Sequence, residues 1–455
     1  MNNEYKSADW IMKILISGDG DTGSHLARQL SMEDQDVILM GRDKAHLDDL
    51  DSRYNIMTYE GIGVSPDSLR EAGVADCDLF IAVTPWENEN MISSQLAKSM
   101  GAGRTVARID NGEFMRPEVR EIFRRTGIDE LVYPEYVAAD VIATTLTRNW
   151  VRSWFELHGG ALIVAGVKLM PGCELDGMPL HDLGKSRNHF HVSAIRRGSE
   201  TIIPRGSDVL HAGDVAYFSM LRGGEEEVAE LCGRSSHKVS KIMISGAGRI
   251  SRQLARRFSG RFDITVIDSD RAKCAKLAAM APGVTVVNSD QRDVDVLREE
   301  GIDSCDVYLA LNDSSEMNIV GCMLAKDAGV EKTIAEIEDI QYFVEADSLN
   351  IDVVINKKLL TSSTIFQMLL DTDLPTPRCL ALEDAEVAEI VAGENSPVTR
   401  APVSDLRLPR DMTLAGMIRD GEGMLVSGST HIRAGDHVVV FCLSGSLNKF
   451  EKLFK

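Results

Sequence analysis

Apolar and polar residues alternate in blocks along the first part of the chain, and the apolar blocks have the length of buried strands. These strand-like runs lie at residues 12–16, 36–40, 79–83 and 105–109. Between the first two runs, Leu26, Ala27 and Leu30 recur at helical spacing. Buried strands that alternate with amphipathic helices predict a parallel sheet covered by helices on both faces. We therefore expect a doubly wound α/β fold of the Rossmann type in this region.

The pattern changes after this region. Brief strand-like runs lie at residues 161–166, 191–195, 201–204 and 215–220, and Gly-rich turns separate them. Short strands at this spacing predict a small β-rich module with one or two helices, of the α+β class.

The α/β region and the β-rich module that follows it both occur twice in the chain. Leu69-Arg70-Glu71-x-Gly73 returns 228 residues later as Leu297-Arg298-Glu299-x-Gly301. The β-rich part repeats as well, because Ala212-Gly213-Asp214 returns as Ala434-Gly435-Asp436. Self-similarity of this kind is the signature of a duplicated unit. We name the predicted domains N1, C1, N2 and C2 in chain order, and expect them at residues 12–150, 151–237, 238–370 and 371–455.

The charge balance narrows the choice of partners. The chain carries 49 basic and 70 acidic residues, and a net charge of −21 opposes non-specific binding to nucleic acid or to an anionic membrane surface. No run of 18 apolar residues and no signal-peptide pattern occurs, so we expect any membrane role to go through a partner. The eight cysteines form no Cys-x-x-Cys pair, which favours a reduced, cytoplasmic setting and no thiolate zinc site.

Two Gly-rich turns are candidates for binding a nucleotide. In N1 the turn reads Gly18-Asp19-Gly20-Asp21-Thr22-Gly23, and in N2 it reads Gly246-Ala247-Gly248-Arg249-Ile250-Ser251. Each turn follows an apolar strand and precedes a helical segment, which is the context that a Gly-x-Gly-x-x-Gly fingerprint requires. Glycine lets the backbone approach a pyrophosphate at the helix N-terminus. Glycine turns without a ligand remain the alternative for each copy.

The end of the second strand is where a carboxylate would bind ribose hydroxyl groups. N2 has Asp268 at this position, and we expect it to bind the ribose. N1 has Gly41 there, followed by Arg42. Arg42 either faces a phosphate, for example a 2′-phosphate, or is a solvated turn residue, and both readings stay open.

The residues at the ends of the other strands differ in charge between the candidate nucleotide sites of N1 and N2. After the third strand N2 has Asp290, where N1 has Ile62. At the fifth strand N1 has Arg108, which could pair with a phosphate, where N2 has Glu336. The fourth strands end in Val83-Thr84 and Leu311-Asn312, at the sheet edge where open α/β folds bind ligands. We therefore expect a cation without a ribose acid in N1, and acids without a cation in N2.

Other reactive groups give weaker signals. His189 and His191 alternate on one predicted strand, which favours a surface pair over a metal site because no third ligand is near. No metal site is predicted, and the sequence shows no Ser/His/Asp or Cys/His pattern typical of nucleophilic catalysis. We therefore expect no catalytic residues and no enzymatic activity, with an NAD(P)-dependent oxidoreductase as the alternative.

Taken together, these motifs resemble the RCK domains, also called KTN domains, of potassium-channel and potassium-transporter regulators. The resemblance covers nearly the whole chain and rests on the two Gly-rich turns, on residues 69–73 and 76–84, on Ala107-Arg108 and on Ala212-Gly213-Asp214. It implies that the N domains bind NAD, as NAD(H), or ATP or ADP. It also implies a homo-oligomeric ring of RCK units, docked on the cytoplasmic face of a membrane potassium-translocating subunit whose potassium uptake it regulates.

The resemblance also places the cofactor contacts on this sequence. In the first copy they are Gly18, Asp19, Gly20, Asp21, Thr22, Gly41, Val83, Thr84 and Arg108. In the second copy they are Gly246, Ala247, Gly248, Arg249, Ile250, Asp268, Leu311, Asn312 and Glu336. The chain departs from the family pattern at Gly41, Ile62, Ser251 and Glu336.

Overall fold

The structure is a computed structural model of the chain. It describes residues 11–32, 35–183, 189–198, 200–234, 238–339, 342, 349–370, 378–382, 385–443 and 447–455. Within these residues, no helix has both the length and the apolar character needed to cross a lipid bilayer.

The first sheet is parallel, with strand order β3-β2-β1-β4-β5-β6. Its strands are β1 Lys13–Ser17, β2 Asp36–Gly41, β3 Met57–Glu60, β4 Leu79–Ala82, β5 Arg104–Arg108 and β6 Glu130–Val132. The connecting helices are α1 Asp21–Met32, α2 Lys44–Arg53, α3 Pro66–Glu71, α4 Glu87–Ser99 and α5 Pro117–Arg125, and α6 Pro134–Thr147 follows the last strand. The strand order reverses between β1 and β4, which creates the crevice where such sheets bind ligands.

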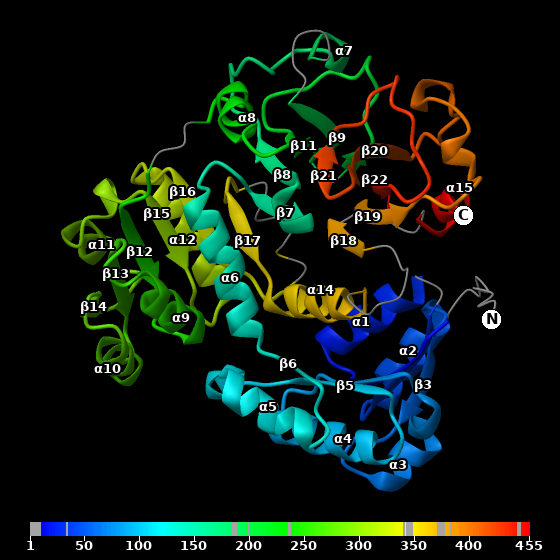
Figure 1. Ribbon diagram of the computed structural model, residues 1–455. Coiled ribbons are helices and arrows are strands. Elements are labelled where there is room, and N and C mark those ends of the chain that lie inside the picture. The colour runs from blue at the N-terminus through cyan, green and yellow to red at the C-terminus, as the bar shows by residue number, and fades with distance from the viewer. Residues whose placement is uncertain are drawn as a thin grey trace. The chain divides into compact units, whose positions relative to one another are not determined.

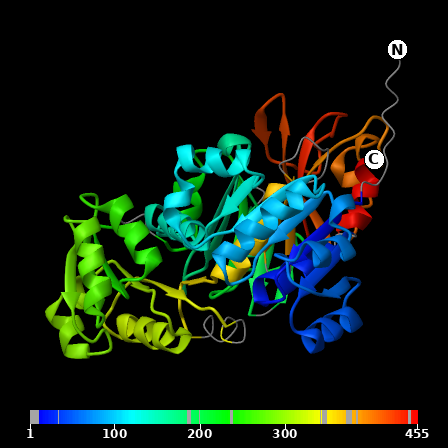
Figure 2. The same ribbon diagram turned by 90° about the horizontal axis from the view of Figure 1, so that it is seen from below.

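The second parallel sheet repeats this order as β14-β13-β12-β15-β16-β17, with helices on both faces (Figures 1 and 2). Its strands are β12 Lys241–Ser245, β13 Asp263–Asp268, β14 Thr285–Asn288, β15 Val307–Ala310, β16 Lys332–Glu336 and β17 Val353–Ile355. Its helices are α9 Arg249–Phe258, α10 Arg271–Met280, α11 Val294–Glu299 and α12 Ser315–Asp327, and α14 Lys357–Leu370 follows the last strand. The predicted pair of doubly wound parallel sheets is thereby confirmed.

Each parallel sheet is followed in the chain by a small antiparallel sheet. The first has the order β10-β9-β11-β8-β7, with β7 Ser153–Leu157, β8 Leu162–Lys168, β9 Phe190–Arg197, β10 Glu200–Ile202 and β11 Val215–Met220. Helices α7 Leu180–Leu183 and α8 Glu225–Leu231 accompany it. The second has the order β18-β19-β22-β20-β21, with β18 Arg378–Leu382, β19 Ala385–Val391, β20 Met412–Arg419, β21 Glu422–Met424 and β22 His437–Leu443, and with helix α15 Leu447–Phe454.

The two compact units of the molecule do not follow the order of the chain. The first unit joins residues 1–137 to residues 357–369, and the second joins residues 138–356 to residues 370–455. Helix α14, which follows the second parallel sheet in sequence, therefore belongs to the unit that contains the first sheet. Most of α6, which follows the first sheet in sequence, belongs to the unit that contains the second sheet.

Polar contacts at equivalent positions fasten these two helices. In the first unit, the Ser362 hydroxyl donates to the backbone oxygen of Thr22 in α1 at 3.2 Å, and Arg104 donates to the backbone oxygen of Met368 at 3.1 Å. In the second unit, Lys332 stands at the place of Arg104. Its amino group donates to the backbone oxygen of Thr145 in α6 and to those of Asn149 and Val151 just after the helix, at 2.8 to 3.2 Å.

Inside the second unit, the two antiparallel sheets share one apolar core. Leu162, Val164 and Tyr217 from the first sheet and Val439 and Phe441 from the second belong to the same buried cluster. The rings of Tyr217 and Phe441 lie 6.1 Å apart. These two sheets therefore form a joint β-rich body, a feature that the sequence analysis did not anticipate.

Candidate nucleotide-binding sites

In N1, glycine is required at two positions of the predicted nucleotide turn. Gly18 has φ +129°, and a Cβ there would lie 2.9 Å from the backbone nitrogen of Thr84. A Cβ on Gly23 would lie 1.8 Å from the backbone oxygen of Gly18. Above Gly20, by contrast, a Cβ would meet no atom within 4 Å. The turn thus packs tightly against the end of β4 while its middle is open to a ligand.

The turn of N2 keeps the same shape with a serine in the third position. Gly246 has φ +103°, and a Cβ there would lie 2.5 Å from the backbone oxygen of Leu311. Ser251 is fully buried, and its hydroxyl donates to the backbone oxygen of Gly246 at 2.6 Å. Serine is tolerated here because the buried hydroxyl has a partner.

Asp268 ends β13 beside this turn. One carboxylate oxygen accepts from the backbone nitrogen of Ala247 at 2.7 Å, and the other accepts from that of Asp270 at 2.7 Å. The side chain therefore fastens the Gly-rich turn to the end of the second strand. Each carboxylate oxygen has two acceptor positions, so hydrogen bonds from a ribose remain possible.

In N1, a carboxylate reaches the same strand end from the turn itself. Asp19 accepts with one oxygen from the backbone nitrogens of Arg42, at 2.7 Å, and Asp43, at 2.8 Å. A Cβ on Gly41 would lie 2.2 Å from the Asp19 side chain, so any side chain at position 41 would collide with it. The sequence at the strand end shows no carboxylate in N1, because the acid that reaches this position comes from the turn.

Two arginines lie at the N1 crevice. The guanidinium of Arg42 lies 2.7 Å from a Glu89 carboxylate oxygen and 4.7 Å from the centre of the Trp86 ring, with half of the side chain exposed. Arg108 donates to the backbone oxygen of Thr84 at 3.3 Å and lies 3.4 Å from Asp110. Both cations are anchored at the edge where Val83 and Thr84 follow β4.

A buried asparagine joins neighbouring strand ends in both parallel sheets. Asn90 accepts from the backbone nitrogen of Thr84 at 2.9 Å and donates to the backbone oxygens of Thr84 and Arg108. Asn318 does the same in N2, with hydrogen bonds to Asn312 and to the backbone oxygen of Glu336. These residues hold the crevice in shape. The asparagine recurs 228 residues later in the sequence, which marked it as part of the repeat but did not reveal its role.

The N2 edge contains a cation that sequence analysis overlooked. Arg292 binds Asp290 through two nitrogens, at 2.9 and 2.7 Å, and these hydrogen bonds lower the pKa of Asp290 to about 2. Asn312 donates to the Ser245 hydroxyl at 2.9 Å, and the side chain of Glu336 is almost fully buried. Arg292 thus partly offsets the negative charge of the predicted acidic edge.

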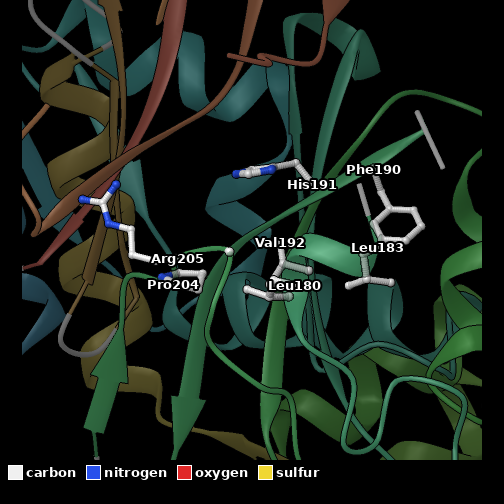
Figure 3. Close-up of a pocket in the computed structure, with 8 residues that line it drawn as sticks. Leu180, Leu183, Phe190, His191, Val192, Pro204 and Arg205 are labelled. Atoms are coloured by element: carbon white, nitrogen blue, oxygen red, sulfur yellow. The ribbon is translucent and has the colours of Figure 1, made fainter. Parts of the chain in front are cut away.

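The first antiparallel sheet carries a separate small cavity of about 160 Å³ (Figure 3). Its lining residues are Leu180, Leu183, Phe190, His191, Val192, Pro204, Arg205 and Gly206. The Nε2 atom of His191 is buried and has no hydrogen-bond partner among the described residues, and burial lowers the pKa of this imidazole to about 4. His189 is exposed, 3.5 Å from Glu227. The predicted surface pair is therefore wrong for His191.

Comparisons with known proteins agree with this architecture. Residues 14–134 and 242–357 match the TrkA-N domain family, and residues 164–233 and 387–455 match the TrkA-C domain family. The Trk system potassium uptake protein TrkA of Halomonas elongata is 28% identical over 454 residues, covering 98% of this chain and 99% of that protein. A TrkA homolog of Archaeoglobus fulgidus is 30% identical over 448 residues, covering 98% of this chain and 100% of that protein.

Solved structures show the same fold at low sequence identity. The crystal structure of the GsuK RCK domain matches with a TM-score of 0.59 and 15% identity, covering 99% of this chain and 96% of that one. The GsuK channel bound to NAD matches with a TM-score of 0.59 and 14% identity, covering 99% of this chain and 80% of that one.

Proposed function

Because the chain belongs to the TrkA family of Trk-system potassium-uptake proteins, we propose that it is a nucleotide-binding regulatory subunit of a potassium-uptake system. The observation that carries the proposal is the duplicated crevice. In both parallel sheets a tightly packed Gly-rich turn lies at the topological switch point, and a carboxylate fastens the second strand end to its neighbours. This is the position where doubly wound sheets bind nucleotides.

The proposed ligand is NAD or NADH, with ATP or ADP as the second candidate. One structure of the same fold is that of a channel bound to NAD, which supports this choice. In N2 we assign the pyrophosphate to residues 246–250 and the ribose to Asp268, with Asp290, Leu311, Asn312 and Glu336 along the crevice. In N1 we assign the corresponding contacts to residues 18–22, Gly41, Arg42, Val83, Thr84 and Arg108.

The proposed mechanism is regulation without chemical turnover. RCK units form a homo-oligomeric ring on the cytoplasmic face of a membrane subunit of the TrkH or TrkG type, and two nucleotide states favour two ring shapes. A coupling free energy of about 1–3 kcal/mol changes transport roughly 5- to 150-fold. The alternative, an NAD(P)-dependent oxidoreductase, is not favoured because the relatives are named as potassium-uptake proteins.

Calorimetric titration of the full-length chain with NAD, NADH, NADPH, ATP and ADP tests the binding. We expect Asp268→Asn to weaken binding at N2 by about tenfold or more, because a charged acceptor for the ribose hydroxyls is lost. Asp263→Asn is the matched control, since Asp263 is exposed at the opposite end of the same strand. Arg108→Met, with exposed Arg125→Met as control, tests N1 in the same way.

A second measurement tests regulation itself. Potassium flux through the membrane subunit, reconstituted with this chain, should depend on the nucleotide that the wild type binds. Binding without any effect on flux would contradict the regulatory role. No binding of any of the five nucleotides would mean that the Gly-rich turns are structural.

A further inference from the structure

Three side chains with metal-binding groups converge where the two antiparallel sheets of the second unit meet. His158 lies in the turn between β7 and β8, Glu389 lies on β19, and His437 begins β22. One ligand atom from each residue lies within 4.8 Å of the other two. The first sheet supplies one of the three groups and the second sheet supplies the other two.

Both imidazole nitrogens face the same carboxylate oxygen. Nε2 of His158 and Nδ1 of His437 each lie 2.7 Å from the same oxygen, Oε1 of Glu389. Nitrogen and oxygen ligands about 2.0–2.1 Å from a tetrahedral Zn²⁺ ion are about 3.3 Å from one another. Each imidazole nitrogen must therefore move away from Oε1 of Glu389 by about half an ångström for an ion to enter.

The backbone fixes the position of these ligands. Glu389 pairs with Val439 across the ladder between β19 and β22, so His437, two residues before Val439, points to the same face of the sheet. His158 has φ +46°, a conformation that few residues other than glycine adopt, and this conformation sets the direction of its ring.

Glu389 is suited to be an anionic ligand. Its side chain is almost fully buried, and its Oε1 oxygen lies 2.7 Å from one nitrogen of each imidazole. The second carboxylate oxygen, Oε2, is buried and has no hydrogen-bond partner among the described residues. A buried charge with one unsatisfied oxygen is costly unless a cation compensates it.

We propose that His158, Glu389 and His437 bind a divalent transition-metal ion, of which Zn²⁺ is the representative, and that the ion links the two antiparallel sheets. Two imidazoles and one carboxylate form a donor set typical of Zn²⁺, with a fourth position for water. Ca²⁺ and Mg²⁺ prefer ligand sets made of oxygen, so the two histidines argue against them. The ion locks the joint β-rich body, because its ligands come from both sheets.

Metal titration of the full-length chain, first freed of metal with a chelator, tests the site. We expect one ion of Zn²⁺ or Co²⁺ per chain in calorimetry, with a Co²⁺ absorption spectrum of the tetrahedral type. His437→Ala and His158→Ala should each weaken binding by about 100-fold or more, since even residues that only support metal ligands cost 10- to 100-fold. His431→Ala is the control, because His431 is an exposed histidine near the same sheet.

Thermal unfolding separates loss of the site from loss of the fold. Zn²⁺ should raise the midpoint of the wild type and of His431→Ala but leave Glu389→Gln unchanged, because an ion that binds only the folded state stabilises it. Circular dichroism without metal establishes that Glu389→Gln is folded. The proposal is wrong if the wild type binds no ion, since the cluster is then a hydrogen-bonded clamp only. It is equally wrong if the three ligand variants bind Zn²⁺ as tightly as the control.

Discussion

Asp19 and Asp268 both bind backbone nitrogens at the end of the second strand of their parallel sheets, but they come from different elements. In N1 the carboxylate stands on the Gly-rich turn and the strand ends in Gly41, whereas in N2 the turn has Ala247 and the strand ends in Asp268. The two copies have thus exchanged which element carries the acid. N1 needs a small residue, Gly41, at the strand end where N2 has Asp268. N2 has a small residue, Ala247, on the turn where N1 has Asp19.

This exchange predicts a compensating pair of substitutions. Gly41→Asp alone should lower the free energy of unfolding by about 2 kcal/mol, because the new side chain collides with Asp19. Combining it with Asp19→Ala recreates the N2 arrangement and should restore most of that loss. Urea denaturation of the two single variants and the double variant measures the coupling. A double variant as unstable as Gly41→Asp would contradict the exchange.

His191 makes stability depend on pH. Its pKa falls from 6.5 to about 4 on burial, so between these values the unfolded chain binds a proton that the folded chain does not. The free energy of unfolding therefore falls as the pH is lowered from 6.5 to 4, by about 3 kcal/mol in all from this residue. His191→Leu, measured by urea denaturation at several pH values, should remove this contribution. The exposed neighbour substitution His189→Leu should leave the pH dependence unchanged.

At this scale the sequence predicted residues whose role follows from local context. Asp268 and the glycines could be identified because a strand end and a turn are read from neighbouring positions. Asp19 was not recognised as a substitute for the missing acid, because that requires knowing that Gly41 leaves space. His158, Glu389 and His437 were not connected, because more than 200 residues separate the first from the others.

At the scale of elements, the buried strands and the parallel, doubly wound class of the sheets were predictable, and the packing partners of two helices were not. The apolar runs predicted strands that the structure confirms in both parallel sheets. An amphipathic helix reveals that one face is buried but not which sheet covers it. The sequences of α6 and α14 therefore did not indicate that these helices pack in a different unit from the sheet that precedes each of them in the chain.

Lys332, at the start of β16, holds the end of one of these helices. It is 5% exposed and donates to the backbone oxygens of Thr145 in α6 and of Asn149 and Val151 just after it. Lys332→Met should lower the stability of the second unit by about 3 kcal/mol, because buried carbonyl groups lose their partner. Guanidinium denaturation followed by circular dichroism measures the loss. Lys241→Met, at the exposed start of β12, should change stability by less than about 0.5 kcal/mol.

At the scale of the whole molecule, the repeat predicted the duplicated architecture. It did not predict which helices and sheets pack together in each compact unit. The repeat predicted two doubly wound parallel sheets and two small β-rich modules, and the structure has two parallel sheets and two antiparallel sheets. The shared core of the antiparallel sheets is formed by residues such as Leu162 and Phe441. A strand that is apolar on both faces could equally be covered by its own helix, so its true neighbour was not predictable.

The first unit is built from two separate segments of the chain, and this predicts which fragments fold cooperatively. A fragment of residues 11–137 lacks α14 and exposes the part of α1 that contacts Ser362. It should show no cooperative thermal transition, whereas the same fragment joined to residues 357–370 by a flexible linker should show one, because buried apolar surface is restored. Differential scanning calorimetry distinguishes the two. Cooperative unfolding of the short fragment at the temperature of the longer one would contradict the prediction.

The exchange of α14 also has a consequence for synthesis on the ribosome. The last strand of the first sheet ends at Val132, but the helix that completes its unit begins at Lys357, about 220 residues later. At 5–20 residues per second, the nascent first unit waits roughly 10–50 s with an apolar surface uncovered. During that interval it is a candidate client for chaperones and for premature association between neighbouring nascent chains. Slower translation of the middle of the gene should therefore lower the yield of native protein.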